Sequence, residues 1–599
     1  MSSHPDDKFS LPYWNRSLPI DDRVQDLIQR MNISEKAGLL FQDKISMKPN
    51  GEFDDERRSV ATTEELVTKR MMNHFNFVGS IKDARVHARW HNRIQSLART
   101  TRLGIPVTIS TDPRNHFTDN IGTSAMAGAF SQWPEPLGFA ALRNAKLVHE
   151  FADIIRQEYL ATGFRLALHP QVDLATEPRW ARVSGGFGED ADLTSQLVTT
   201  YIKGLQGVSL GPQSVSAMTK HFPGGGPQKD GEDPHFTYGK DQVYDGNNME
   251  YHLKPFRAAI TAGTSQIMPY YGQPIRTKYE EVGFAFNKQI ITELLREELG
   301  FQGIVCTDWG LITDSMIMGQ DMPARCWGLE HLSRTDRVQR LLESGCDMMG
   351  GESCPELVVQ LVEEGRISES RVDISVERVL REKFVLGLFD NPFVDIDAAA
   401  QIAGCESFRA KANQAQRQSY TLLKNDRNIL PLLSIKDKQI YVEGIDPSMI
   451  KARGGIVVDN PETAEIAFLR LKAPYEPRPG GFEALFHAGS LEFSPKEKSR
   501  QGAIFKTVPI VVVDLYLDRP ATIPEIAGAV SALLVNYGSS PEAFLDVIFG
   551  DAEPTGLLPF DLPSSMDAVR ASRSDVPYDT KDPLFRFGDG LRYAQIKLE

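Results

Sequence analysis

The sequence predicts an α/β protein in which an N-terminal (β/α)8-type TIM barrel is followed by an αβα sandwich. From about residue 75 to 385, short apolar runs alternate with amphipathic helical patterns. Repeated units of this kind over such a length are typical of a parallel sheet that closes into a barrel. A second, shorter alternation follows after residue 415. The 599 residues of the chain are enough for two or three domains of ordinary size.

The elements of the barrel are indicated by apolar runs and by helix-end signals. One amphipathic helix is expected to end at Gly163, and another to begin after Asn287 and end at Gly300, because Asn favours the first helical turn and Gly the position after the last. Residues 20–31 carry an apolar stripe at helical spacing and are expected to pack outside the barrel. The candidate strands lie at residues 105–110, 164–168, 215–219, 266–268, 304–307 and 346–349.

The second unit is expected to hold its own parallel sheet. Its candidate strands lie at residues 439–444, 466–471, 510–515 and 533–536. Residues 510–515 read IVVVDL, and so apolar a run is typical of a central strand that helices cover on both faces. The domains are therefore predicted at residues 1–385 and 415–599, with residues 386–414 as the linker.

Composition and charge indicate which kinds of binding partner the protein is expected to lack. A net charge of −14 disfavours nucleic acid and anionic membranes as partners. No run reaches the roughly 18 apolar residues of a transmembrane helix. The N-terminus lacks the basic and apolar regions of a signal peptide, and the five cysteines lack metal-ligand spacing. We therefore expect a cytoplasmic protein with reduced thiols, without a metal or cofactor.

Four clusters of polar residues stand at or near the ends of predicted strands. Asp308 and Trp309 follow the strand 304–307 directly, at the end where barrel enzymes carry their active sites. A carboxylate there either attacks an anomeric carbon or caps the next helix, and the tetrapeptide alone leaves both open. Lys220 and His221 follow the strand 215–219 and lead into a Gly-rich turn.

The other two clusters contain Arg182 and Asp112. Arg182 belongs to the run at residues 177–190, in which Arg179, Glu189 and Asp190 are expected to form structural ion pairs. Asp112 is a further carboxylate at a strand end.

Together these clusters resemble glycoside hydrolase family 3, in the two-domain form of its β-glucosidases. The matching motifs occur in the family's order, as LGIP at residues 103–106, PRWAR with FGED between 178 and 190, KHFPG at 220–224, and GFQGIVCTDW at 300–309. In the second unit, residues 548–559 and 583–593 are similar to the C-terminal signatures. The chain is expected to lack the fibronectin-type third domain of many relatives.

The resemblance implies a retaining double displacement with Asp308 as the nucleophile. It implies that Asp112, Arg182, Lys220 and His221 hold the sugar hydroxyls and that Trp309 contacts the sugar. Tyr271 is the tyrosine expected near the nucleophile, with Tyr270 as the alternative.

The acid/base is expected to be a Glu of the second domain that reaches the barrel mouth. Glu476, just past the strand 466–471, is the predicted residue, and Glu483 is the alternative. Arg478 beside Glu476 would hold a neighbouring carboxylate ionised. The family's N-acetylglucosaminidases use an Asp-His dyad instead, and Asp233-Pro234-His235 lies in the corresponding region. The loop at residues 224–245, which contains this tripeptide, is expected to shape the aglycone side of the pocket.

The predicted function is hydrolysis of terminal non-reducing β-D-glucosyl residues from soluble glycosides or oligosaccharides, with transglycosylation as a side reaction. Two alternatives stay open: a β-N-acetylhexosaminidase, and a sugar-binding protein that has lost catalysis. The second conflicts with the retained polar residues, because buried polar groups are costly to keep. Linkage, aglycone preference and oligomeric state, a homodimer included, are left open.

Overall fold

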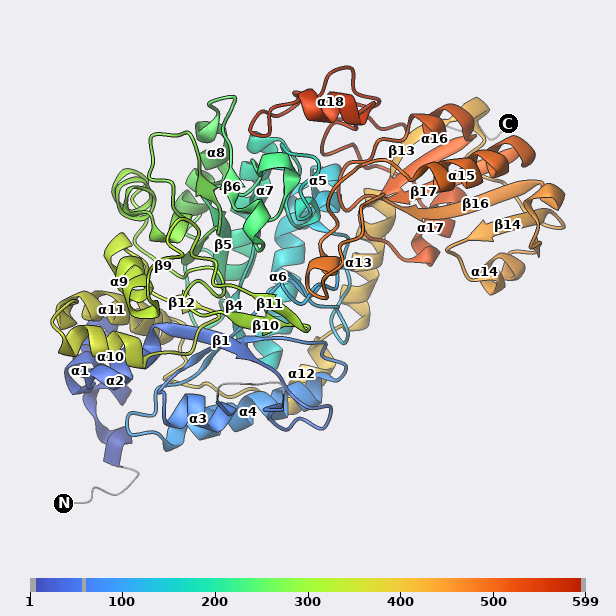
Figure 1. Ribbon diagram of the computed structural model, residues 1–599. Helices are drawn as coiled ribbons and strands as arrows, with labels where there is room; N and C mark the ends of the chain where they lie inside the picture. Colours follow the sequence, from blue (N-terminus) through green and yellow to red (C-terminus); the bar gives the residue numbers. More distant parts are fainter. Residues whose placement is uncertain (1–6, 57–60, 594–599) are drawn as a thin grey trace.

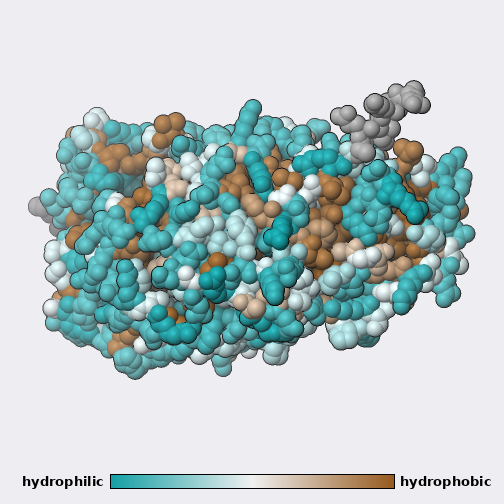
Figure 2. All heavy atoms as spheres, turned by 90° about the horizontal axis from the view of Figure 1, so that it is seen from above, coloured by the Kyte–Doolittle hydropathy of each residue, from teal (hydrophilic) through white to brown (hydrophobic). Residues whose placement is uncertain are grey.

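The computed structural model describes residues 7–56 and 61–593. Two sheets dominate this part of the chain, and Figure 1 shows them side by side, with the barrel on the left and the second sheet on the right. The face in Figure 2 is mainly hydrophilic, with small scattered hydrophobic patches. Within the described ranges, no helix has both the length and the apolar character needed to span a bilayer.

The first sheet is a closed parallel barrel of eight strands. Its strands follow one another around the ring as β12, β1, β2, β3, β4, β5, β7 and β9. The ring closes where Cys306 pairs in parallel with Met348, beside a hydrogen bond of 2.9 Å from the Thr307 amide to the Met348 carbonyl. The bounds are β1 Phe41–Ile45, β2 His74–Phe77, β3 Thr108–Thr111, β4 Phe164–Ala167, β5 Ser216–Phe222, β7 Gln266–Pro269, β9 Ile304–Val305 and β12 Met349–Gly350. The six predicted strands are confirmed with shifted ends, whereas β1 and β2 were not predicted.

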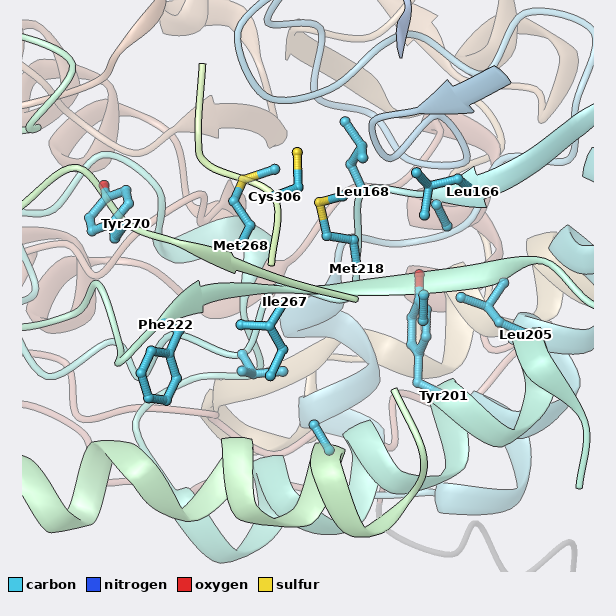
Figure 3. Packing of buried hydrophobic residues seen from close by; sticks show 14 of the residues in the cluster. Leu166, Leu168, Tyr201, Leu205, Met218, Phe222, Ile267, Met268, Tyr270 and Cys306 are labelled. Carbon is cyan, nitrogen blue, oxygen red and sulfur yellow. The ribbon is translucent and has the colours of Figure 1, made fainter. Parts of the chain in front are cut away.

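Helices alternate with these strands and supply the outer layer of the core. Gly163 and Gly300 stand after helix ends with positive φ, as expected, and the side chain of Asn287 accepts a bond from the Ile290 amide. In Figure 3, Ile267 and Phe222 point toward the helices, whereas Met268 and Cys306 point to the opposite side of the strands. The helices are α1 Ile20–Arg30, α3 Thr63–Thr68, α4 Ala84–Thr100, α6 Ala145–Thr162, α7 Ala191–Gln206, α8 Met249–Thr261, η7 Gln289–Glu298, α9 Arg334–Ser344, α10 Glu356–Glu363 and α11 Glu369–Val385.

The segment predicted as the linker is largely helical. It contains α12 (Ile396–Ile402) and the first part of α13 (Glu406–Ser419). Helix α12 packs on α4 and α6 of the barrel, and α13 packs on α5 (Pro136–Leu142) and on α17 (Pro541–Ile548) of the second unit. The connection is therefore a packed bridge, and the exact domain boundaries stay a prediction.

The second sheet has six strands in the order β13, β18, β17, β16, β14, β15, and β13 is antiparallel to its neighbour. Side chains alternate along its strands. Val511 and Val513 face the cluster with α15 and α16, whereas Val512 faces the cluster with α14 and α17. This is an αβα sandwich. Its elements are β13 Thr421–Asn425, β14 Gln439–Glu443, β15 Ile456–Val457, β16 Ile466–Lys472, β17 Ile510–Tyr516, β18 Ala532–Asn536, α14 Pro447–Ala452, α15 Pro495–Thr507 and α16 Pro524–Ala529.

The C-terminal segment returns to the barrel near α18 (Met566–Ala571), seen at the top of Figure 1. Buried Glu189 accepts from the amides of Asp561 and Tyr578. Asp190 accepts from the Tyr578 hydroxyl at 2.7 Å. The expected ion pair is confirmed for Arg179, which binds Glu177 at 2.8 Å, whereas Glu189 and Asp190 act as hydrogen-bond anchors for the second unit.

Candidate active site

The predicted polar residues meet at the carboxyl ends of the barrel strands. Asp112 follows β3, Lys220 and His221 belong to β5, and Tyr271 and Asp308 follow β7 and β9. Parallel strands bring these ends to one mouth of the barrel. The side chains therefore come from four strands although they are separated by almost 200 positions in the chain.

Asp308 is buried, and one of its oxygens points at the other polar residues. Its Oδ1 accepts from the Trp309 amide at 2.8 Å. Its Oδ2 lies 3.8 Å from His221 Nε2 and has no hydrogen-bond partner among the residues described. The helix-cap alternative is wrong, because the next element after Asp308 is the strand β10 (Ser315–Ile317).

His221 is held by Asp173, a residue that sequence reasoning missed. Asp173 Oδ2 lies 2.7 Å from His221 Nδ1, and Oδ1 accepts from the amides of His221 and Gly225. Burial, reinforced by the charges of nearby cations, lowers the pKa of His221 well below its usual value. A neutral ring that donates from Nδ1 to Asp173 presents Nε2 as an acceptor beside Asp308.

Asp112 and Lys220 form a nearly buried ion pair of 3.0 Å. Asn76, at the end of β2, donates to the other oxygen of Asp112 at 2.8 Å. The Lys220 ammonium therefore keeps hydrogen-bonding capacity for a ligand, because it has three donor protons.

Arg182 lies between Gln171 and the ring of Tyr270, with its guanidinium carbon 5.8 Å from the ring centroid. Burial alone would lower the pKa of Arg182, but the acidic groups around it, with Tyr270 and Asp233 foremost, outweigh burial and raise that pKa. Arg182 is thus a fixed cation in a buried polar pocket.

The structure distinguishes the two tyrosines. The Tyr271 hydroxyl accepts from the Trp309 amide at 3.0 Å and donates to the Trp309 carbonyl at 2.9 Å. The Tyr270 hydroxyl is buried without a hydrogen-bond partner in the described residues, and its ring is tilted against that of His221 with the ring centroids 4.7 Å apart. Tyr271 is therefore the tyrosine tied to the backbone beside the nucleophile candidate.

The Asp233-Pro234-His235 loop closes over Tyr271. His235 Nδ1 lies 2.6 Å from Asp233, and the His235 ring lies 4.7 Å from that of Tyr271. Trp327 donates to the Pro234 carbonyl at 2.9 Å. The loop is therefore held by its contacts with Tyr271 and with Trp327.

A loop of the second unit, residues 473–490, reaches this mouth. Arg478 donates to Glu232 at 2.7 and 2.9 Å, and Tyr238 donates to Glu483. Buried Arg519 gathers the loop by donating to four of its carbonyls and also to the Arg179 carbonyl of the barrel.

The two candidate acid/base residues differ in burial. Glu476 is exposed and Glu483 is buried. Arg478 forms its ion pair with Glu232. The expectation that Arg478 would hold Glu476 ionised is therefore weakened. In the described residues, the hydrogen bonds and ion pairs connect neither Glu to Asp308, so the acid/base stays a prediction.

Comparison with known proteins identifies the class. Residues 20–382 match the model of the glycosyl hydrolase family 3 N-terminal domain, and residues 486–593 match that of the family's C-terminal domain. The first match alone spans more than half of the chain, so the chain belongs to glycosyl hydrolase family 3.

Several curated relatives are similar over nearly their whole length. The probable beta-glucosidase C of Aspergillus flavus is 57% identical over 97% of this chain and 92% of that protein. The periplasmic beta-glucosidase/beta-xylosidase of Dickeya chrysanthemi is 38% identical over 97% and 91%. Among solved structures, the beta-glucosidase from Listeria innocua in complex with glucose has a TM-score of 0.76 at 20% identity, covering 96% of this chain and 83% of that one. This last likeness supports the fold.

Proposed function

We propose that this protein is a retaining β-glucosidase in which Asp308 forms the covalent glycosyl-enzyme. The observation that carries the proposal is Asp308 Oδ2, which is buried at the barrel mouth, faces His221 and has no hydrogen-bond partner in the part of the chain that the structure describes. A carboxylate oxygen without a protein partner is available to attack an anomeric carbon. The relatives named as beta-glucosidases support glucose as the sugar.

The surrounding residues define the proposed sugar site. Asp112, Lys220 and Arg182 offer charged acceptors and donors to hydroxyl groups, neutral His221 offers a ring nitrogen, and Trp309 offers an apolar ring face. A sugar without one of these hydroxyls would leave a buried polar group unpaired, which discriminates strongly against it.

The second step needs an acid/base, and we propose Glu476 with Glu483 as the alternative. This residue protonates the leaving oxygen and then activates water or, in transglycosylation, a second sugar. Loss of the true acid/base slows release of poor leaving groups and lets azide capture the glycosyl-enzyme. We expect Glu476→Ala to give a β-glycosyl azide. If Glu483→Ala does so instead, the assignment moves to Glu483.

Substrate comparison tests the function itself. We expect hydrolysis of aryl β-D-glucoside to exceed that of aryl β-D-xyloside and aryl N-acetyl-β-D-glucosaminide, and Asp308→Asn to abolish turnover. Preference for the glucosaminide would favour the hexosaminidase, in which Asp233 and His235 would act as the dyad. No turnover of any of the three would favour a lapsed sugar-binding protein, and full activity of Asp308→Asn would exclude the proposed mechanism.

A further inference from the structure

A cavity of about 360 Å³ adjoins the proposed sugar site and lies between the barrel and the second unit. Ligand pockets begin at roughly 300 Å³, so this space is large enough to be one. Gln171, Arg182 and Lys220 form the wall that it shares with the sugar site. Its remaining walls come from residues 113–136 and 184–185 of the barrel and from residues 472–487 and 516–518 of the second unit.

The cavity lies on the side of the barrel mouth away from the nucleophile. In the eight-strand ring, β3 stands four strands from β9, and the residues that follow β3 and β4 line this cavity. A second cavity, of about 450 Å³, lies on the nucleophile side and is lined by Trp309, Lys44 and Glu352 near the ends of β9, β1 and β12. A sugar with its anomeric carbon at Asp308 therefore extends toward the shared wall of the first cavity.

The first cavity is lined mainly by polar and charged side chains from both units, among them Lys220, His487 and Asp518. His487 binds one carboxylate oxygen of Asp518. Such a lining offers both hydrogen-bond donors and acceptors, which suits a ligand rich in hydroxyl groups.

We infer that this cavity is a subsite for a second sugar, attached to the bound glucosyl unit at the end remote from its anomeric carbon. The inference rests on the proposed function and names its substrate class, which is glycosides of β-linked disaccharides that are released as intact disaccharides. In the first step the aglycone oxygen takes the proton of the acid/base and leaves as the glycosyl-Asp308 bond forms. In the second step water cleaves that bond, gives its hydroxyl group to the disaccharide and returns a proton to the acid/base.

The probes are p-nitrophenyl β-cellobioside and β-gentiobioside, which carry the second glucose on O4 and on O6. With at least one of them, we expect the disaccharide and nitrophenol as the first products by chromatography at early times. Glucose together with nitrophenyl glucoside as the first products would overturn the inference. Hydrolysis of the simple nitrophenyl glucoside is measured in parallel, and failure there, in contrast, would overturn the proposed function.

Asp518→Ala tests the position of the subsite. We expect at least a tenfold loss of kcat/KM on the disaccharide glycoside that wild type releases, with the simple glucoside changed less than twofold. Glu356→Ala is the matched control, because Glu356 is an exposed carboxylate that lines the second cavity. Equal losses on both substrates in Asp518→Ala, or a selective loss in Glu356→Ala, would refute the placement.

Discussion

The substitution Asp173→Asn is expected to reverse the hydrogen-bonding direction of His221. The Asn oxygen replaces Oδ1 and keeps the bonds from the His221 and Gly225 amides. The amide nitrogen then stands where Oδ2 met His221 Nδ1, and two donors cannot face each other. The ring therefore takes the other tautomer, in which Nε2 carries the proton and points at Asp308, 3.8 Å away.

The expected loss of activity follows from the new hydrogen bond between His221 and Asp308. A hydrogen bond to a charged group contributes roughly 1.5–3 kcal/mol, and this bond must weaken when Asp308 attacks. We expect kcat/KM on aryl β-glucoside to fall about 10- to 150-fold, since about 1.4 kcal/mol corresponds to a factor of ten. The melting temperature should change little because both backbone bonds remain.

The assay compares kcat/KM across pH, since burial raises the pKa of Asp173 to about 6 and its protonation should mimic the substitution. Glu158→Gln is the matched control, because it neutralises another buried carboxylate, one that lines neither the sugar site nor the adjoining cavity. If Asp173→Asn retains wild-type kcat/KM at pH 7, the tautomer argument is refuted.

Three other substitutions test the surroundings of the site. Tyr271→Phe should cost about 1–2 kcal/mol of stability in urea unfolding, because it removes two hydrogen bonds but leaves the Trp309 carbonyl bonded to Arg325; a much larger loss would contradict this. Burial raises the pKa of Glu135 from 4.5 to about 7, so the folded state binds a proton that the unfolded state releases, and stability falls as pH rises from about 4.5 to 7. Glu135→Gln should reduce the difference in melting temperature between pH 5 and pH 8. An unchanged difference would show that Glu135 is not the source of this pH dependence. Arg519→Met removes a guanidinium that bonds five carbonyls and holds the loop 473–490, which carries the proposed acid/base. We expect kcat on alkyl glucosides to fall at least tenfold, and an unchanged kcat in the variant would show that the loop keeps its position without Arg519.

The sequence predicted six barrel strands, including those that carry Asp112, Lys220 and Asp308, and missed β1 and β2. Strand β1 reads FQDKI and β2 reads HFNF, so polar residues interrupt both runs. These polar residues point to function: Gln42 donates to Ser110 at 2.6 Å, and Asn76 donates to Asp112. The residues that build a polar pocket thus weaken the apolar signal by which a strand is recognised.

The candidate site divides in the same way. Asp308, Lys220 and His221 could be predicted because each stands directly at or after an apolar run. Asp173 lies beyond the end of β4 in a segment without periodicity, so only the fold shows that it orients His221. The choice between second-unit carboxylates also depends on long-range packing, which local sequence does not encode.

The loop that Arg519 gathers belongs to one folded unit, while the wall that it faces belongs to the other. The width of the pocket is therefore a property of the joint between them. A change in how the sandwich sits on the barrel would therefore alter the width of the pocket without altering the polar cluster. In this architecture, selection for new substrates can act on α13 and the joint while the residues that perform the chemistry stay unchanged.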